Sequence, residues 1–109
     1  MPQASLQLNH LNIPARDPDG LAKWYADTFG LRHDGNKARS EDVLLVFQKG
    51  EPVNRAPELH MGLRVPSMAT LKEWQAKLGG EIFNGAEFAA FKVSDPEGNC
   101  IELYAPIGS

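Results

Sequence analysis

The chain has 109 residues, of which 42% are hydrophobic and 23% are charged, and its formal net charge is -3. This balance is typical of one globular domain and not of a disordered segment. Because the chain is acidic and contains no run of lysine or arginine, nucleic acid is not expected as a partner.

The first half of the chain predicts a strand, a helix and then short strands. Residues 6–13 alternate between apolar and polar side chains, which is typical of a strand. A helix is expected to follow, with Asp17 as its N-cap, Pro18 at its first position and Gly30 at its end. The dipeptide Asp34-Gly35 then predicts a tight turn between two short strands.

The second half predicts the same elements in the same order. Residues 59–65 form the expected strand, and a helix is expected to begin at Ser67 and to end at Gly79-Gly80. The dipeptide Asn84-Gly85 predicts the second tight turn. Closing strands are expected at residues 43–47 and 100–105.

The two halves are copies of one unit, related by an offset of fifty positions. The identical pairs are His10/His60, Leu21/Leu71, Trp24/Trp74, Ala26/Ala76, Gly30/Gly80 and Gly35/Gly85. Each copy follows the order β-α-β-β-β, so an α+β fold of two tandem modules is predicted, with the modules at residues 1–49 and 58–109 and a linker at 50–57. Together they are expected to form a single domain over residues 1–109. The paired tryptophans are predicted to pack in the core between helix and sheet.

Strand alternation then indicates which side chains point away from the helices. Met61 and Leu63 share the apolar face of their strand, so His60 lies on the other face. Glu102 lies between the apolar residues Ile101 and Leu103 in the same way. A carboxylate in such a strand is costly to bury unless it is paired or binds a metal.

His10 occupies the position in the first copy that His60 occupies in the second. Any one of these residues alone is more typical of an ordinary strand position. Two histidines at equivalent positions of two pseudo-symmetric units are expected to approach each other, with Glu102 as a third ligand. Two imidazoles and one carboxylate form a facial ligand set that leaves open positions on a divalent metal. The sequence therefore predicts a metal site formed by His10, His60 and Glu102.

Three further residues have the alternation expected of a substrate-binding surface: Asn12, Arg64 and Tyr104. Arg64 could hold an anionic substrate, although a solvated arginine at the rim is the favoured interpretation. Asn12 and Tyr104 could also be ordinary strand residues. Cys100 is interpreted as a small buried residue, and His33, beside a turn, as a surface residue.

Three segments give the chain a resemblance to the vicinal oxygen chelate superfamily. They are Leu8-Asn9-His10-Leu11-Asn12, the helix end Trp24-Tyr25-Ala26-Asp27-Thr28-Phe29-Gly30, and Asp95-Pro96-Glu97-Gly98-Asn99-Cys100-Ile101-Glu102-Leu103. This superfamily includes glyoxalase I, extradiol dioxygenases, fosfomycin resistance proteins and bleomycin resistance proteins. The resemblance implies paired modules whose sheets curl around a metal cleft, with His10, His60 and Glu102 at three of the metal positions. It also implies one divalent ion per site, drawn from Fe, Mn, Zn, Ni or Co.

One position departs from the glyoxalase I pattern, in which a fourth ligand lies on the closing strand of the first module. Aligning residues 43–47 with residues 100–104 puts Leu45 in that slot, and leucine cannot bind a metal. This favours the branches with three protein ligands, the ring-cleaving dioxygenases and the fosfomycin-type transferases, over a glyoxalase I lyase. Glu102, the remaining carboxylate, is then the candidate catalytic residue as well as a ligand.

Two functions from different classes follow from these observations. The first is a metal-dependent enzyme, a lyase, dioxygenase or transferase, that chelates vicinal oxygens of a small substrate and stabilises charge on it. The second is a non-catalytic drug-binding protein of the bleomycin-resistance type. A homodimer is expected, with each cleft built either within one chain or from one module of each of two chains.

The expected location is the cytoplasm. Cys100 is the only cysteine, which fits a reducing compartment, and residues 1–5 do not have the pattern of a signal peptide. No apolar run approaches the roughly 18 residues of a membrane span, so no membrane partner is expected.

Overall fold

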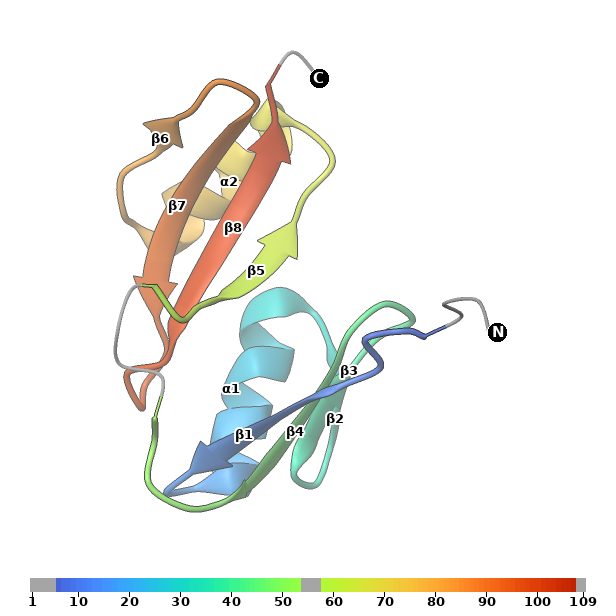
Figure 1. The fold of residues 1–109 in the computed structure, drawn as a ribbon. Coiled ribbons are helices and arrows are strands. Elements are labelled where there is room, and N and C mark those ends of the chain that lie inside the picture. The colour runs from blue at the N-terminus through green and yellow to red at the C-terminus, as the bar shows by residue number, and fades with distance from the viewer. Residues whose placement is uncertain (1–5, 54–57, 108–109) are drawn as a thin grey trace. The chain divides into compact units, whose positions relative to one another are not determined.

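The computed structural model describes residues 6–53 and 58–107, and the chain divides into two units, the first ending at Pro52 and the second beginning at Val53. Each unit contains one four-stranded sheet and one helix (Figure 1). The predicted α+β class and the order β-α-β-β-β in both copies are confirmed.

Unit 1 contains β1 (Leu11–Ala15), α1 (Pro18–Phe29), β2 (Arg32–Asp34), β3 (Lys37–Arg39) and β4 (Leu44–Lys49). Its sheet has the order β1-β4-β3-β2. β1 runs parallel to β4, and the other pairs are antiparallel. The parallel pair is possible because α1 provides the crossover between β1 and the rest of the sheet.

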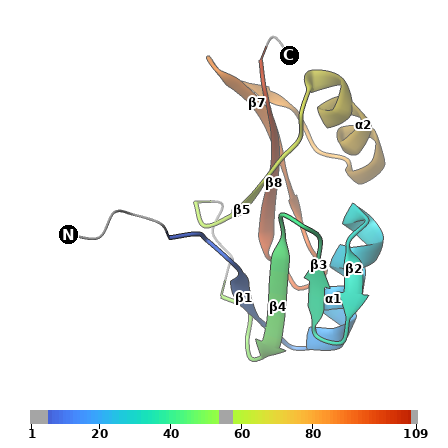
Figure 2. The ribbon, with the colours of Figure 1, turned by 90° about the vertical axis from the view of Figure 1, so that its right-hand side faces the viewer.

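Unit 2 repeats this topology. It contains β5 (Met61–Arg64), α2 (Met68–Leu78), β6 (Phe83–Asn84), β7 (Phe88–Ser94) and β8 (Cys100–Pro106). The sheet order is β5-β8-β7-β6, with β5 parallel to β8. Figure 2 shows α2 on one side of β7 and β8, so that within unit 2 this helix covers one face of the sheet.

The helices begin and end where the sequence predicts. The Asp17 carboxylate accepts a hydrogen bond from the Gly20 backbone amide at 3.1 Å, and the Ser67 hydroxyl accepts one from the Thr70 amide at 3.2 Å. Gly30 ends α1 in the left-handed conformation, with φ at 72°. Among the described residues, no helix is long and apolar enough to cross a membrane.

The core of each unit lies between its helix and its sheet. In unit 1, Tyr25 is fully buried, and its ring centroid lies 5.3 Å from that of Phe47. In unit 2, Leu71 of α2, the repeat partner of Leu21, is also fully buried. The prediction that Trp24 and Trp74 lie in the core is wrong, since both are half-buried. They lie at the edge of the apolar helical stripe, where Trp24 packs edge-on against Tyr25 and the Lys77 ammonium lies over the Trp74 ring.

The first strand of each unit begins later in the sequence than predicted. The predicted strand 6–13 is β1, which begins at Leu11, because pairing with β4 begins at the Leu11–Leu45 register. The predicted strand 59–65 is β5, which spans Met61–Arg64. Leu6 and Leu8, which the pattern assigned to the first strand, are 94% and 96% exposed. The closing strands are present. The first tight turn lies at residues 35–36, next to the predicted dipeptide, and the second lies at residues 86–87, just after the predicted Asn84-Gly85. Part of the predicted linker, residues 54–57, lies outside the described residues.

Candidate functional site

The face of each sheet opposite its helix, here called the open face, carries the candidate residues. In β8 the alternation is regular: Ile101, Leu103 and Ala105 are buried toward α2. The intervening side chains, including Glu102 and Tyr104, are half-buried on the open face. The predicted orientation of Glu102 is therefore confirmed.

His60 and Glu102 lie beside each other in unit 2. β5 pairs with β8 so that Gly62 is directly opposite Glu102, and His60 precedes Gly62 by two residues. The His60 Nε2 atom is 3.6 Å from Glu102 Oε1, and the side chains are 27% and 23% exposed. Gly62 itself has no side chain, and a Cβ at this position would lie 3.5 Å from the Tyr104 ring.

This pair has donor atoms of the right type and spacing for a metal. Imidazole nitrogen and carboxylate oxygen bind ions such as zinc at about 2.0–2.2 Å, so two ligands of one ion lie at most about 4.4 Å apart. The observed separation of 3.6 Å falls within that limit. Taken by itself, neither unit brings together three His, Cys, Asp or Glu side chains in its described residues. The described residues of unit 2 therefore offer two ligands for such an ion, His60 and Glu102.

Lys92 is a member of this cluster that the sequence did not indicate. It lies directly opposite Glu102 across the β7–β8 pair, and its Nζ atom is 3.9 Å from Glu102 Oε2. Glu102 thus has His60 near one oxygen and Lys92 near the other. The apolar residues Ala89, Phe91 and Val93 alternate with their neighbours, which indicates that Lys92 lies on the opposite face of the strand. That Lys92 lies opposite Glu102, however, follows only from the bounds and the register of β7.

The segment Asp95-Pro96-Glu97-Gly98-Asn99, the most specific part of the resemblance, fixes the register of this cluster. Asp95 and Asn99 are 5% and 1% exposed. The Asp95 carboxylate accepts hydrogen bonds from the backbone amides of Glu97 and Asn99 at 2.8 and 3.0 Å, and from the Asn99 side chain at 2.7 Å. Gly98, at a φ of 90°, supplies the left-handed residue that the turn requires. The turn connects β7 to β8 and so positions Lys92 opposite Glu102.

In unit 1, His10 directly precedes β1, as His60 directly precedes β5. Its side chain is exposed, and its Nδ1 atom is 3.1 Å from the Asn9 side-chain oxygen. Asn12 lies on the open face, where its amide donates a 2.8 Å hydrogen bond to Gln48. His33 is exposed, as predicted, and its ring is hydrogen-bonded to the Gly35 carbonyl.

The remaining predicted residues, Arg64 and Tyr104, lie opposite each other on β5 and β8. Arg64 is exposed, and Tyr104 is half-buried. The Tyr104 ring packs edge-on against Phe88, with the ring centroids 5.6 Å apart. Phe88 is 46% exposed and Phe83, on the neighbouring strand, is 73% exposed, so the open face of unit 2 has an aromatic part that the sequence analysis missed.

The alignment that put Leu45 in the fourth ligand position is wrong by one residue. In unit 2 the register pairs Met61 with Ile101 and Gly62 with Glu102. In unit 1 it pairs Leu11 with Leu45 and Asn12 with Val46. Since Asn12 is the repeat partner of Gly62, Val46 is the equivalent of Glu102.

The side chains agree with this register. Leu45 is 3% exposed and packs under α1, whereas Val46 is half-buried on the open face. Lys37 lies directly opposite Val46, as Lys92 lies opposite Glu102. Valine cannot bind a metal either, so the fourth position still carries no ligand.

Comparison with known proteins places the chain among glyoxalase-like proteins. Residues 10–104 match the family model of the glyoxalase-like domain. No curated protein matches the chain by sequence.

Solved structures share the fold over almost the whole chain. The oxidase ChaP-H1 is 22% identical, with a TM-score of 0.73 over 96% of this chain and 100% of that one. A lactoylglutathione lyase from Agrobacterium tumefaciens is 18% identical, with a TM-score of 0.62 over 95% of each chain. TnmS3, an antibiotic binding protein from Streptomyces sp. CB03234, is 21% identical, with a TM-score of 0.64 over 95% of this chain and 98% of that one. At these identities the similarity shows a shared fold, and a fold alone does not determine function.

Proposed function

Because the chain belongs to the glyoxalase-like domain family, as its resemblance to the vicinal oxygen chelate superfamily predicted, we propose that it is a divalent-metal-dependent enzyme acting on a small substrate with two neighbouring oxygens. The observation that carries this proposal is the His60–Glu102 pair, with 3.6 Å between a nitrogen and an oxygen on one open face. His10, the repeat partner of His60, is proposed as the third ligand.

In this proposal the metal supplies Lewis-acid stabilisation to the substrate oxygens. His60 and His10 hold the ion as neutral imidazoles. Glu102 would be the carboxylate ligand, and Lys92 Nζ, 3.9 Å from Glu102 Oε2, would balance part of its charge. Arg64 and Tyr104, opposite each other on the same face, are proposed to orient the substrate, and Asn12 to contribute from unit 1.

Metal content tests this proposal directly. Protein purified without chelators is expected to contain about one divalent ion per chain by elemental analysis. His60→Ala and Glu102→Gln should each lower the affinity for the ion by at least about tenfold, because each removes a ligand. The matched control is His33→Ala, which removes an exposed histidine outside the proposed set. Equal metal content in His60→Ala and in the unaltered protein would contradict the ligand assignment.

The second candidate function is binding of an aromatic small molecule without catalysis. The exposed Phe83, Phe88 and Tyr104 on one open face favour it, because aromatic rings stack on such surfaces. The two functions separate experimentally. A metal-independent binder should retain its affinity for a planar aromatic ligand in Glu102→Gln, whereas an enzyme that chelates its substrate should lose it.

We further propose a homodimer. β1 and β5 are edge strands of their sheets, and the exposed Leu6 and Leu8 alternate immediately before β1. Edge strands next to exposed apolar side chains are surfaces on which a second copy can add. Light scattering at micromolar concentration should give twice the mass of one chain, and Leu8→Ser should shift the equilibrium toward monomer. A monomeric mass for the unaltered protein would refute this prediction.

The cytoplasm is proposed as the place of action. The composition supports this location, since the sequence has one cysteine, Cys100, which is half-buried in β8. Proteins that use no disulfide are compatible with a reducing compartment. Fractionation of cells expressing the protein tests this location.

A further inference from the structure

Unit 1 contains two arginines that lie directly opposite each other and form no ion pair with an acidic side chain among the described residues. Arg32 on β2 lies directly opposite Arg39 on β3. Like charges at directly opposed positions of a strand pair repel each other. The next pair along the same strands, Asp34 opposite Lys37, has the opposite-charge arrangement that a sheet normally favours.

Arg39 lies on the open face of unit 1, because its neighbour Ala38 is fully buried toward α1. The Nε atom of Arg39 is buried and donates no hydrogen bond within the described residues. A buried charged donor without an acceptor is unfavourable and rare in folded proteins. Neither Arg39 nor Arg32 forms an ion pair in the part of the chain that the structure describes, whereas Arg16, in the same unit, is 2.8 Å from Glu51.

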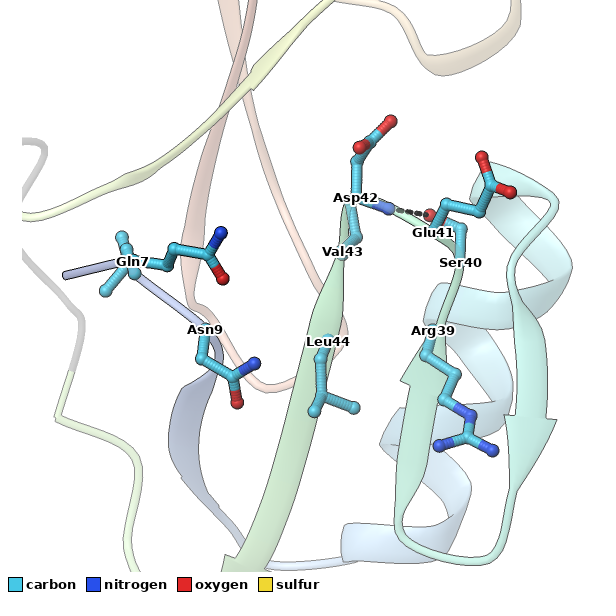
Figure 3. A pocket seen from close by; sticks show the side chains of 9 residues that line it. Gln7, Asn9, Arg39, Ser40, Glu41, Asp42, Val43 and Leu44 are labelled. Atoms are coloured by element: carbon cyan, nitrogen blue, oxygen red, sulfur yellow. Dashed lines mark hydrogen bonds between the residues drawn. The ribbon is translucent and has the colours of Figure 1, made fainter. Parts of the chain in front are cut away.

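Two open cavities have Arg39 in their lining. One, of about 430 Å³, is lined by Arg32, Arg39, Ser40 and Glu41. The other, of about 390 Å³, extends from Arg39 and Ser40 along the β3–β4 turn to Leu44 and residues 7–9. Figure 3 shows the Arg39 side chain extending from β3 with Leu44 and Asn9 on the neighbouring segments. Volumes of this size accommodate small molecules.

We propose that Arg39 and Arg32 bind an oxyanionic group, a carboxylate or a phosphate, of a small-molecule ligand. A guanidinium presents its donors in a planar fork that matches two oxygens of such a group. The anion would supply the acceptor that Arg39 Nε lacks and would screen the repulsion between the two arginines. Glu41, which lines both cavities, opposes an anion and sets a limit on affinity. The subsite lies wholly in unit 1 and does not rest on the proposed metal site.

The test uses metal-free protein and three probes: inorganic phosphate, benzoate and the neutral analogue benzamide. The Nε–Hε resonance of Arg39 in ¹H–¹⁵N spectra should shift and saturate with phosphate or benzoate, and the anion that binds identifies the class. Benzamide should leave it unchanged. Arg39→Gln should weaken binding at least tenfold, and Arg39→Lys should weaken it less, since it keeps the charge but loses the fork.

Matched variants make the result decisive. Arg16→Gln removes an arginine of the same unit outside both cavities and should leave binding unchanged. Glu41→Gln should strengthen binding several-fold. Arg32→Gln, at an exposed position, should weaken it several-fold and serves if Arg39→Gln does not fold. An equal response to benzamide, a shift that does not saturate, or unchanged binding in both arginine variants would overturn the proposal.

Discussion

Asp95→Ala is expected to lower the free energy of unfolding by about 3 kcal/mol, and so to lower the melting temperature by roughly 10 °C or more. The carboxylate is 5% exposed and accepts hydrogen bonds from the backbone amides of Glu97 and Asn99 and from the side-chain amide of Asn99. Alanine leaves all three donors without this acceptor, inside a turn where water has little access. Each buried donor left in that state costs on the order of 1–3 kcal/mol, less whatever local relaxation recovers.

Two variants make this result specific. Asp34→Ala removes an exposed acidic residue at the turn of unit 1 and should change stability by less than about 0.5 kcal/mol. Asp95→Asn should cost less than Asp95→Ala, because the new amide keeps an oxygen for the two backbone donors. Its nitrogen can donate to Asn99 Oδ1, which has no hydrogen bond among the described residues, once the Asn99 amide rotates. Denaturant melts of the three proteins measure the order, and equal stability of Asp95→Ala and the unaltered protein would contradict it.

The features that the sequence predicts well are those determined by neighbouring residues. Asp17, Ser67 and Gly30 cap helices through contacts within a few positions, so the pattern alone locates the helix ends. The repeat gives the order of elements in unit 2 once it is known in unit 1. The alternation of residues around Glu102 indicates which face of β8 its side chain occupies, because its direct neighbours Ile101 and Leu103 are apolar and buried.

The features that it misses depend on contacts far apart in the chain. The start of β1 is set by where β4 can pair with it, so alternation at Leu6 and Leu8 does not make a strand there. Tyr25 is the core residue instead of Trp24 because the position of α1 on its sheet decides which side of the helical stripe is covered. Lys92 required the β7–β8 register, which the turn at Asp95 sets.

The fourth ligand position shows what an error of one residue in strand register changes. Comparing residues 43–47 with residues 100–104 by similarity alone makes Leu45 the equivalent of Glu102. The pairing of β4 with β1 and of β8 with β5 instead makes Val46 the equivalent of Glu102. A shift of one residue moves a side chain from one face of a sheet to the other. In the observed register the fourth position still has no ligand, but the residue at which one could be introduced is Val46 and not Leu45.

Val46→Glu is therefore expected to create a fourth metal ligand, whereas Leu45→Glu is expected to unfold unit 1. At position 46 the new carboxylate would lie on the open face opposite Lys37, the arrangement that Glu102 has with Lys92. It should be tolerated within about 1 kcal/mol, since the charge is half-exposed and has a cation opposite. At position 45, which is 3% exposed beneath α1, an unpaired carboxylate is expected to cost several kcal/mol.

The two variants add the same charge at adjacent positions, so a difference in their stability reports which of the two side chains faces the core. Urea unfolding should show Val46→Glu near the stability of the unaltered protein and Leu45→Glu far below it. In the proposed metal site, Val46→Glu should also raise affinity for the divalent ion by at least about tenfold, measured by competition with a chelating dye. The unaltered protein, which lacks this carboxylate, should convert the methylglyoxal–glutathione hemithioacetal far more slowly than about 1 per second. A stable Leu45→Glu beside an unfolded Val46→Glu would reverse the register assigned to β4. Unchanged metal affinity in a stable Val46→Glu would instead leave the register standing and remove position 46 from the metal site.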